Sequence, residues 1–207
     1  MTLFKSKRFS KLLKQLNCKL ENEASVWSNL RNAYHESHRY YHTEQHIDEC
    51  LQLFDTYHYL AKKPLEVEFA LWFHDAVYNT EAADNEDKSA LWAKEILLHG
   101  GVKDTVITRI YNLILATAHQ QQAPQTNDEK LLVDIDIAIF AASSERFAEY
   151  QQQIRKEYAW VSEHIYQQKR REVLNNFYNS PILYYCDEIR KQLEIQARLN
   201  LLQALVT

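Results

Sequence analysis

The chain has 207 residues, of which 46% are hydrophobic and 25% charged, so it is long enough to bury one hydrophobic core. Its formal net charge of −4 is spread along the sequence without a basic stripe, which argues against a nucleic-acid-binding protein. We therefore expect a small molecule or a protein as the partner and no nucleic-acid polymer.

The sequence also argues against a membrane protein and against a disulfide scaffold. No apolar run approaches the roughly 20 residues that span a bilayer, and the first 20 residues are too polar for a signal peptide. Cys18, Cys50 and Cys186 are far apart and form no CxxC pair, so neither disulfides nor a thiolate metal site is indicated. We expect a cytoplasmic protein that makes no membrane contact and uses its cysteines as small packing residues.

Two glycines and three prolines leave few of the turns that sheets require, which favours an all-α fold. Apolar residues recur at helical spacing from Phe9 to Glu36. A second helix is predicted from Thr43, as its N-cap, to Ala61. Pro64 suits the first turn of a third helix, which carries the apolar stretch FALWFHDAV, residues 69–77.

Five more helices are predicted over residues 84–99, 103–119, 144–164, 167–178 and from 181 to the C-terminus. Gly100 and Gly101 should end the first of these. The segment LLVDIDIAIF, residues 131–140, alternates as a strand would, but no partner strand is evident, so we predict a helix there. A long loop is expected over residues 120–128. Residues 1–207 should form one helical bundle in a single domain.

Histidines and aspartates in apolar surroundings are the residues that suggest chemistry. An ionised carboxylate there is costly unless it is paired, hydrogen-bonded or bound to a metal, and Asp75 and Asp136 both stand in such surroundings. A lone histidine on an apolar helix face is more often a core residue than a ligand. In combination, however, His46, His74, Asp75 and Asp136 make a mixed nitrogen and oxygen site for a divalent transition metal.

These residues carry a resemblance to a known superfamily. HTEQH, FHDAVY and DID resemble the H…HD…D signature of the HD-domain superfamily of metal-dependent phosphohydrolases. Longer stretches, covering nearly the whole chain, are similar to a family of predicted HD-type phosphohydrolases of this length: RYYHTEQHI, ALWFHDAVYNTEAADNEDKSA, LATAH, VDIDIAIF, IRKEYAWV and ARLNL.

The resemblance implies a helical bundle of the HD-domain and phosphodiesterase-like type, with one divalent ion. The identity of the ion is open among Mn, Mg, Fe, Co, Ni and Zn. The implied reaction is hydrolysis of a small phosphate ester, either a phosphomonoester or a phosphodiester, by metal-activated water. A nucleotide is a candidate substrate. The oligomeric state stays open.

The resemblance also implies roles for individual residues. His46, His74, Asp75 and Asp136 would be the ligands, with Asp134 as the rival of Asp136 because Asp-x-Asp leaves the register open. The arrangement YHxxxH is similar to that of cyclic-nucleotide phosphodiesterases, which makes His42 a candidate general acid.

Three further residues are weaker candidates on the same resemblance. His119 falls where some relatives bind a second metal or a substrate phosphate. Glu86 is a candidate for activating water, although a charge run like DNEDK is usually a solvated helix start. A phosphate contact is expected from Arg170, which is chosen among Arg155, Lys169, Arg170 and Arg171.

Two alternatives belong to different functional classes. Some HD-fold proteins are di-iron oxygenases, which need two metals and more ligands than this sequence offers. A non-catalytic helical module that keeps the metal as a structural staple, or senses a ligand, would have a closed coordination shell and hydrolyse no phosphate ester.

Overall fold

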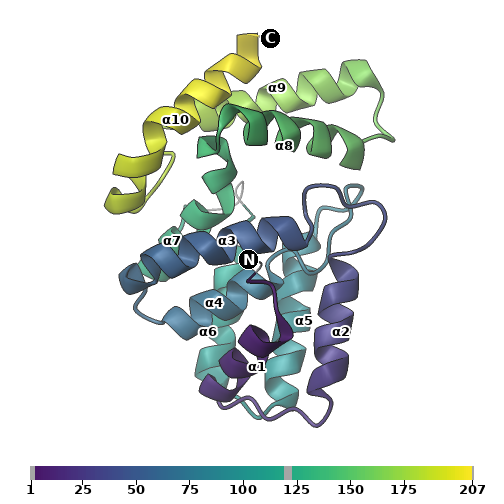
Figure 1. The fold of residues 1–207 in the computed structure, drawn as a ribbon, viewed down its shortest axis with the longest axis vertical. Helices are drawn as coiled ribbons and strands as arrows, with labels where there is room; N and C mark the ends of the chain where they lie inside the picture. Colours follow the sequence, from purple (N-terminus) through teal and green to yellow (C-terminus); the bar gives the residue numbers. More distant parts are fainter. Residues whose placement is uncertain (1–2, 119–122, 207) are drawn as a thin grey trace. The chain divides into compact units, whose positions relative to one another are not determined.

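The computed structural model describes residues 3–118 and 123–206, and these form helices and connecting loops without a strand (Figure 1). The all-α prediction is therefore confirmed for this part of the chain, while the HD type stays a prediction. The chain divides into two compact units, residues 1–133 and 134–207, and each is described by itself. The single domain expected over residues 1–207 also stays a prediction.

The helices of the first unit are α1 (Ser6–Gln15), α2 (Glu23–Ala33), α3 (Glu44–Tyr57), the 3-10 turn η1 (His58–Leu60), α4 (Pro64–Phe73), α5 (Asn85–His99) and α6 (Asp104–Leu115). Helix α7 (Asn127–Asp136) begins in this unit, and its last residues belong to the second. The second unit continues with η2 (Ile137–Ala141), α8 (Ser144–Glu157), α9 (Glu163–Asn179) and α10 (Asp187–Val206).

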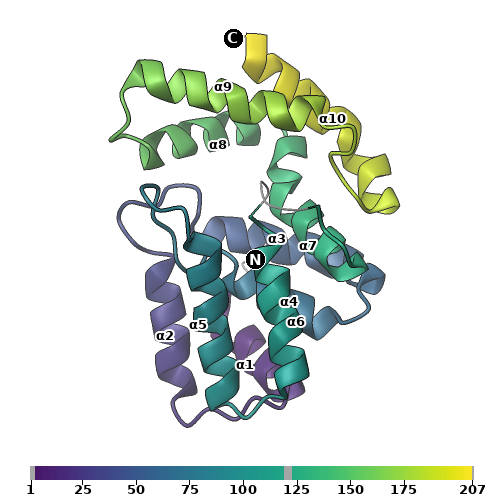
Figure 2. The same cartoon turned by 180° about the vertical axis from the view of Figure 1, so that it is seen from behind.

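Helix α4 is the centre of the first unit. It contacts α1, α3, α5 and α6, and α5 and α6 lie side by side beyond it (Figure 2). All its residues from Phe69 to Phe73 are fully buried, as expected for a helix that is apolar on every side. Trp72 packs among the rings of Phe4, Phe9 and Trp27. This packing fixes the C-terminal end of α4, where the next two residues are His74 and Asp75.

Several local signals in the sequence are confirmed. The hydroxyl of Thr43 accepts a hydrogen bond from the Gln45 amide at 3.3 Å and caps α3. Pro64 stands in the first turn of α4. Helix α5 ends at Gly100 and Gly101, and Gly101 has a φ of 71°. The positive φ explains why glycine stands there, since side chains with a Cβ disfavour it.

Several helices end earlier than predicted, and at two of these ends the cause is visible. The helical pattern over residues 9–36 is broken after α1 by Asn17, whose φ of 56° lets the amide of Cys18 bond to the Leu13 carbonyl. The helix expected to reach residue 164 ends at Glu157. The guanidinium of Arg155 donates to the carbonyls of Tyr158 and Val161, which satisfies the turn without a helix.

The ambiguous segment at residues 131–140 is helical, as predicted, running through the end of α7 into η2. In the second unit, η2 and α9 pack against α10. The buried amide of Asn200 on α10 donates to the carbonyls of Phe140 and Ala142, which fixes the chain where η2 ends.

None of the described helices combines the length and the hydropathy needed to cross a bilayer.

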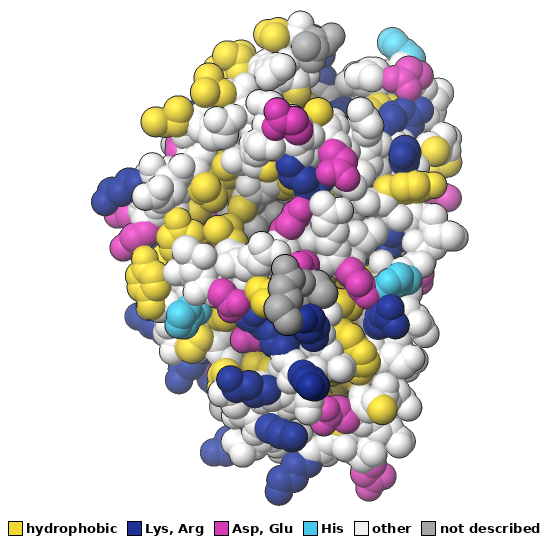
Figure 3. All heavy atoms as spheres, viewed as in Figure 1, with side chains coloured by type: hydrophobic (Ala, Val, Ile, Leu, Met, Phe, Trp, Pro, Cys, Tyr) yellow, Lys and Arg dark blue, Asp and Glu magenta, His cyan; other side chains and the backbone are white. Residues whose placement is uncertain are grey.

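Cationic side chains gather over α1 on the face seen in Figure 3. The first 20 residues of the sequence carry six Lys and Arg and no Asp or Glu, which departs from the even spread of charge expected. A surface hollow of about 470 Å³ lies here and is lined partly by Lys7, Arg8 and Lys11. It contains none of the predicted site residues, and Arg8 is neutralised by Asp55 and Glu68 at 2.7 Å.

Candidate metal centre

Two neighbouring helices bring three of the predicted ligands together in the first unit. His46 lies in the first turn of α3, on the inner face that also carries Ile47 and Cys50. His74 is the C-cap residue of α4, and Asp75 follows it. Because α3 packs against α4, the first turn of one helix meets the last turn of the other.

The ligand atoms converge closely. His46 Nε2 lies 3.1 Å from His74 Nε2, and Asp75 Oδ2 lies 3.1 Å from His74 Nε2 and 3.4 Å from His46 Nε2. Ligands about 2.0–2.1 Å from one ion are separated by about 2.9–3.4 Å in octahedral or tetrahedral geometry. The triangle of atoms therefore has the dimensions of one face of a coordination shell.

The tautomer of His74 suits metal binding. Its Nδ1 lies 3.0 Å from the carbonyl oxygen of Leu71, which can only accept a hydrogen bond, so Nδ1 carries the proton. In the neutral ring Nε2 then offers a lone pair toward His46 and Asp75. A ring nitrogen that donates to a backbone carbonyl is the usual support of a metal-binding histidine.

Asp75 faces the same point with a buried oxygen. Within the described part of the chain, Oδ2 has no hydrogen bond of good geometry, and the two imidazole nitrogens lie 3.1 and 3.4 Å from it. Burial alone would raise the pKa of Asp75, but the positive charge that His74 and His42 can carry, together with the close contacts of His46 and His74, holds this pKa well below its usual value. Asp75 is therefore a carboxylate at neutral pH.

One proton shared among His46 Nε2, His74 Nε2 and Asp75 Oδ2 cannot give all three atoms a good hydrogen bond. If His46 Nε2 carries a hydrogen, it can point directly at His74 Nε2 or at Asp75 Oδ2, and the other acceptor is left without a well-directed donor. A cation would satisfy all three at once. The C-terminal end of α4 adds the negative end of its helix dipole. The residues present therefore fit a divalent ion.

Arg39 holds the main chain of the centre in place. Its fully buried guanidinium donates to the carbonyl of Asp75 at 2.6 Å and to that of Ala76 at 3.0 Å. It also donates to the carbonyl of His42 at 3.3 Å and to Glu36 at 2.9 Å. One side chain thus ties the loop before α3 to the turn after α4. The sequence does not predict this role, since a single Arg before YYH has no local signal.

His42 lies beside the centre. Its ring stacks on Tyr78 with centroids 4.0 Å apart, and its centroid lies 6.0 Å from that of His46. The stacking fixes the ring on the side of the ligand cluster, within reach of a molecule bound to an ion there.

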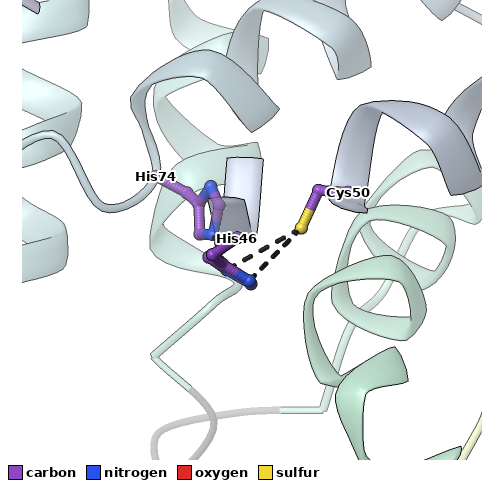
Figure 4. Close-up of side chains that lie close together, drawn as sticks. All are labelled: His46, Cys50 and His74. Carbon is purple, nitrogen blue, oxygen red and sulfur yellow. Dashed lines mark hydrogen bonds between the residues drawn. The ribbon is translucent and has the colours of Figure 1, made fainter. Parts of the chain in front are cut away.

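Cys50 lies nearer to the centre than the sequence pattern indicates. It lies one turn beyond His46 on α3, and its Sγ is 3.7 Å from both ring nitrogens of His46 (Figure 4). His46, Cys50 and His74 each offer a ligand atom within 4.8 Å of the others. The spacing H-x-x-x-C on one helix face is the signal that could have found it, but no CxxC pair accompanies that spacing.

Asp134 and Asp136 belong to the second unit. Both carboxylate oxygens of Asp134 accept backbone hydrogen bonds, from Tyr185 at 2.7 Å and Cys186 at 2.6 Å. These bonds hold the segment before α10, which explains why that helix begins at Asp187 rather than near Pro181. Asp136 is the last residue of α7 and is half-buried. Its role as a ligand stays a prediction.

The remaining candidates lie elsewhere. Glu86 is half-buried in the first turn of α5. Arg170 belongs to the second unit, where its guanidinium donates to Gln151 and lies 5.0 Å from the ring centroid of Tyr150. His119 lies outside the described residues. The roles predicted for these three residues stay predictions.

Comparison of the chain with protein-family models, with curated proteins and with solved structures found no match.

Proposed function

We propose that this protein is a divalent-metal-dependent phosphohydrolase of the HD type, with His46, His74, Asp75 and Asp136 as ligands of one ion. The observation that carries the proposal is the triangle of His46 Nε2, His74 Nε2 and Asp75 Oδ2, with sides of 3.1–3.4 Å. Asp136 completes the set on the sequence pattern alone. Hydrolysis of a phosphate ester is inferred from the resemblance of the ligand motifs.

An ion bound by these residues would supply Lewis-acid polarisation of a phosphoryl oxygen and a water that ionises near neutral pH. Around it, the residues of the chain have distinct tasks. The neutral imidazoles and the carboxylate hold the charge, and Arg39 keeps the turn that carries Asp75 against the loop that carries His42. His42 would donate a proton to the leaving oxygen, which spares the departing group a full negative charge.

The test begins with the metal content of protein purified without chelator. We expect about one divalent ion per chain, and hydrolysis of at least one phosphate ester in a screen with added Mn²⁺, Mg²⁺, Co²⁺ and Ni²⁺. Two ions per chain, with oxygen consumption, would instead favour a di-iron oxygenase. One tightly held ion without turnover of any ester would favour a structural metal.

A histidine outside the proposed centre provides a matched control. His99 lies in the last turn of α5 on the surface, and its Nδ1 lies 2.7 Å from the carbonyl of Glu95. His99→Ala should leave metal content and turnover unchanged, whereas His74→Ala should abolish both. Equal metal content in the two variants would contradict the site.

A further inference from the structure

Two sets of donors share the same pair of histidines. Asp75 approaches them with an oxygen whose nearest imidazole nitrogen is 3.1 Å away. Cys50 approaches them with a sulfur that belongs to a second group with His46 and His74, in which the ligand atoms lie within 4.8 Å of one another. The members of this second group are all buried, and Cys50 is only 2% exposed.

The spacing in the second group suits a thiolate ligand. A metal–sulfur bond of about 2.3 Å and a metal–nitrogen bond of about 2.0–2.1 Å place sulfur about 3.6 Å from nitrogen in a tetrahedral shell. The Sγ of Cys50 lies 3.7 Å from Nε2 of His46 and equally far from Nδ1, and Figure 4 shows the thiol directed at that ring.

The two groups differ in chemical softness. Carboxylate and water ligands suit Mg²⁺ and Mn²⁺, whereas a thiolate selects softer ions such as Zn²⁺. A buried cysteine that only packs would also satisfy the contacts of Cys50, because free cysteine is among the most buried residue types. The position of its sulfur, with ligand atoms of both histidines within 4.8 Å, distinguishes Cys50 from a packing residue.

We propose that Cys50 is a thiolate ligand that, with His46 and His74, captures soft divalent ions such as Zn²⁺ and Cd²⁺ at this centre. The thiol loses its proton to solvent when the sulfur–metal bond forms. Ions that prefer oxygen bind through Asp75 without the sulfur. The inference rests on the proposed function only in taking the two histidines as metal ligands, and it does not depend on hydrolysis.

Cobalt is the probe, because Co²⁺ replaces Zn²⁺ and reports its ligands by absorption. The full chain, purified with chelator and then titrated with Co²⁺, should show ligand-field bands in the visible and a sulfur-to-cobalt charge-transfer band in the near ultraviolet. Cys50→Ser should lose the charge-transfer band and keep the ligand-field bands. Cys18→Ser and Cys186→Ser, which change the other two cysteines, should keep both.

Affinity gives a second measurement. Cys50→Ser and Cys50→Ala should bind Cd²⁺ at least about 10-fold more weakly than the wild type. Loss of a residue that only supports a ligand already costs about 10-fold or more, so loss of a ligand should cost at least as much. The affinity for Mn²⁺ should stay unchanged. Wild-type protein that shows ligand-field bands without a charge-transfer band overturns the role of Cys50, whether or not the variants fold. Wild-type protein that binds no Co²⁺ overturns the metal centre itself as well.

Discussion

Two buried carboxylates, one in each unit, sit in opposite surroundings. Asp134 receives two backbone amides, and its burial raises its pKa to about 6 although the amides of Cys186 and Tyr185 oppose this shift. Asp75 faces two imidazole nitrogens, and its pKa lies well below the usual value despite burial. A carboxylate supplied with backbone N–H donors holds the fold, whereas one that faces two imidazoles is arranged for a cation.

The largest effect should come from removing the groups around Asp75. Asp75→Ala and His46→Ala each remove a proposed ligand. Loss of a group that only supports a ligand lowers metal affinity by roughly 10–100-fold, so these two variants should lose more than that. The apo variants should fold, because the centre holds more acceptors than donors. Metal content after dialysis, with circular dichroism as the check on folding, measures this. Full metal retention in Asp75→Ala would show that Asp75 resembles Asp134, and full retention in His46→Ala would remove His46 from the ligand set.

His42 should affect turnover without affecting the ion. Its ring stacks on Tyr78 beside the ligand cluster, so His42→Gln should retain the metal while turnover falls by roughly 10²–10⁴-fold, as expected for a lost general acid. Metal content and turnover of the ester found in the screen are measured on one preparation. Loss of the ion in this variant would move His42 into the ligand set.

Asp134 should matter for stability and not for the ion. Asp134→Ala leaves the amides of Tyr185 and Cys186 without their acceptor, and should lower the free energy of unfolding by about 2–4 kcal/mol. Urea unfolding measures this loss. Asp187→Ala, which removes an exposed partner of Arg190, is the control and should change stability by about 0.5 kcal/mol.

A comparison of Asp134 with Asp136 tests the predicted fourth ligand. Asp136→Ala should release the ion, whereas Asp134→Ala should keep it bound. The reverse result would make Asp134 the ligand and would remove the contrast between the two carboxylates.

Arg39 should give the smallest effect. Arg39→Met removes the donors to the carbonyls of Asp75 and Ala76, so the turn loosens and metal affinity should fall by roughly 10–100-fold. Arg39→Lys should recover only part of this, because an ammonium cannot reproduce the fork of a guanidinium. Arg31→Met, at an exposed arginine of α2, is the control for a lost cation. Unchanged affinity in Arg39→Met would leave Arg39 a purely structural residue.

Much of the fold follows from short stretches of sequence. Apolar residues at helical spacing, Thr43 before α3, Pro64 at the start of α4 and Gly101 after α5 act within one or two turns of chain, so they can be read in order. The pattern of histidines and aspartates in apolar stretches likewise indicates a metal centre. The helix ends at Asn17 and Glu157 do not follow from composition, because a left-handed backbone angle decides the first and the bonds of the Arg155 guanidinium to loop carbonyls decide the second.

The sequence by itself determined the helical class and the residue types of the centre, because both depend on local periodicity and on the cost of burying charge. Only the tertiary structure decided which of these groups meet. The rings of His46 and His74 are 28 residues apart in the chain, and Asp134 finds its donors 51 and 52 residues away. Such contacts arise when whole helices pack, and no pattern within a single helix specifies them.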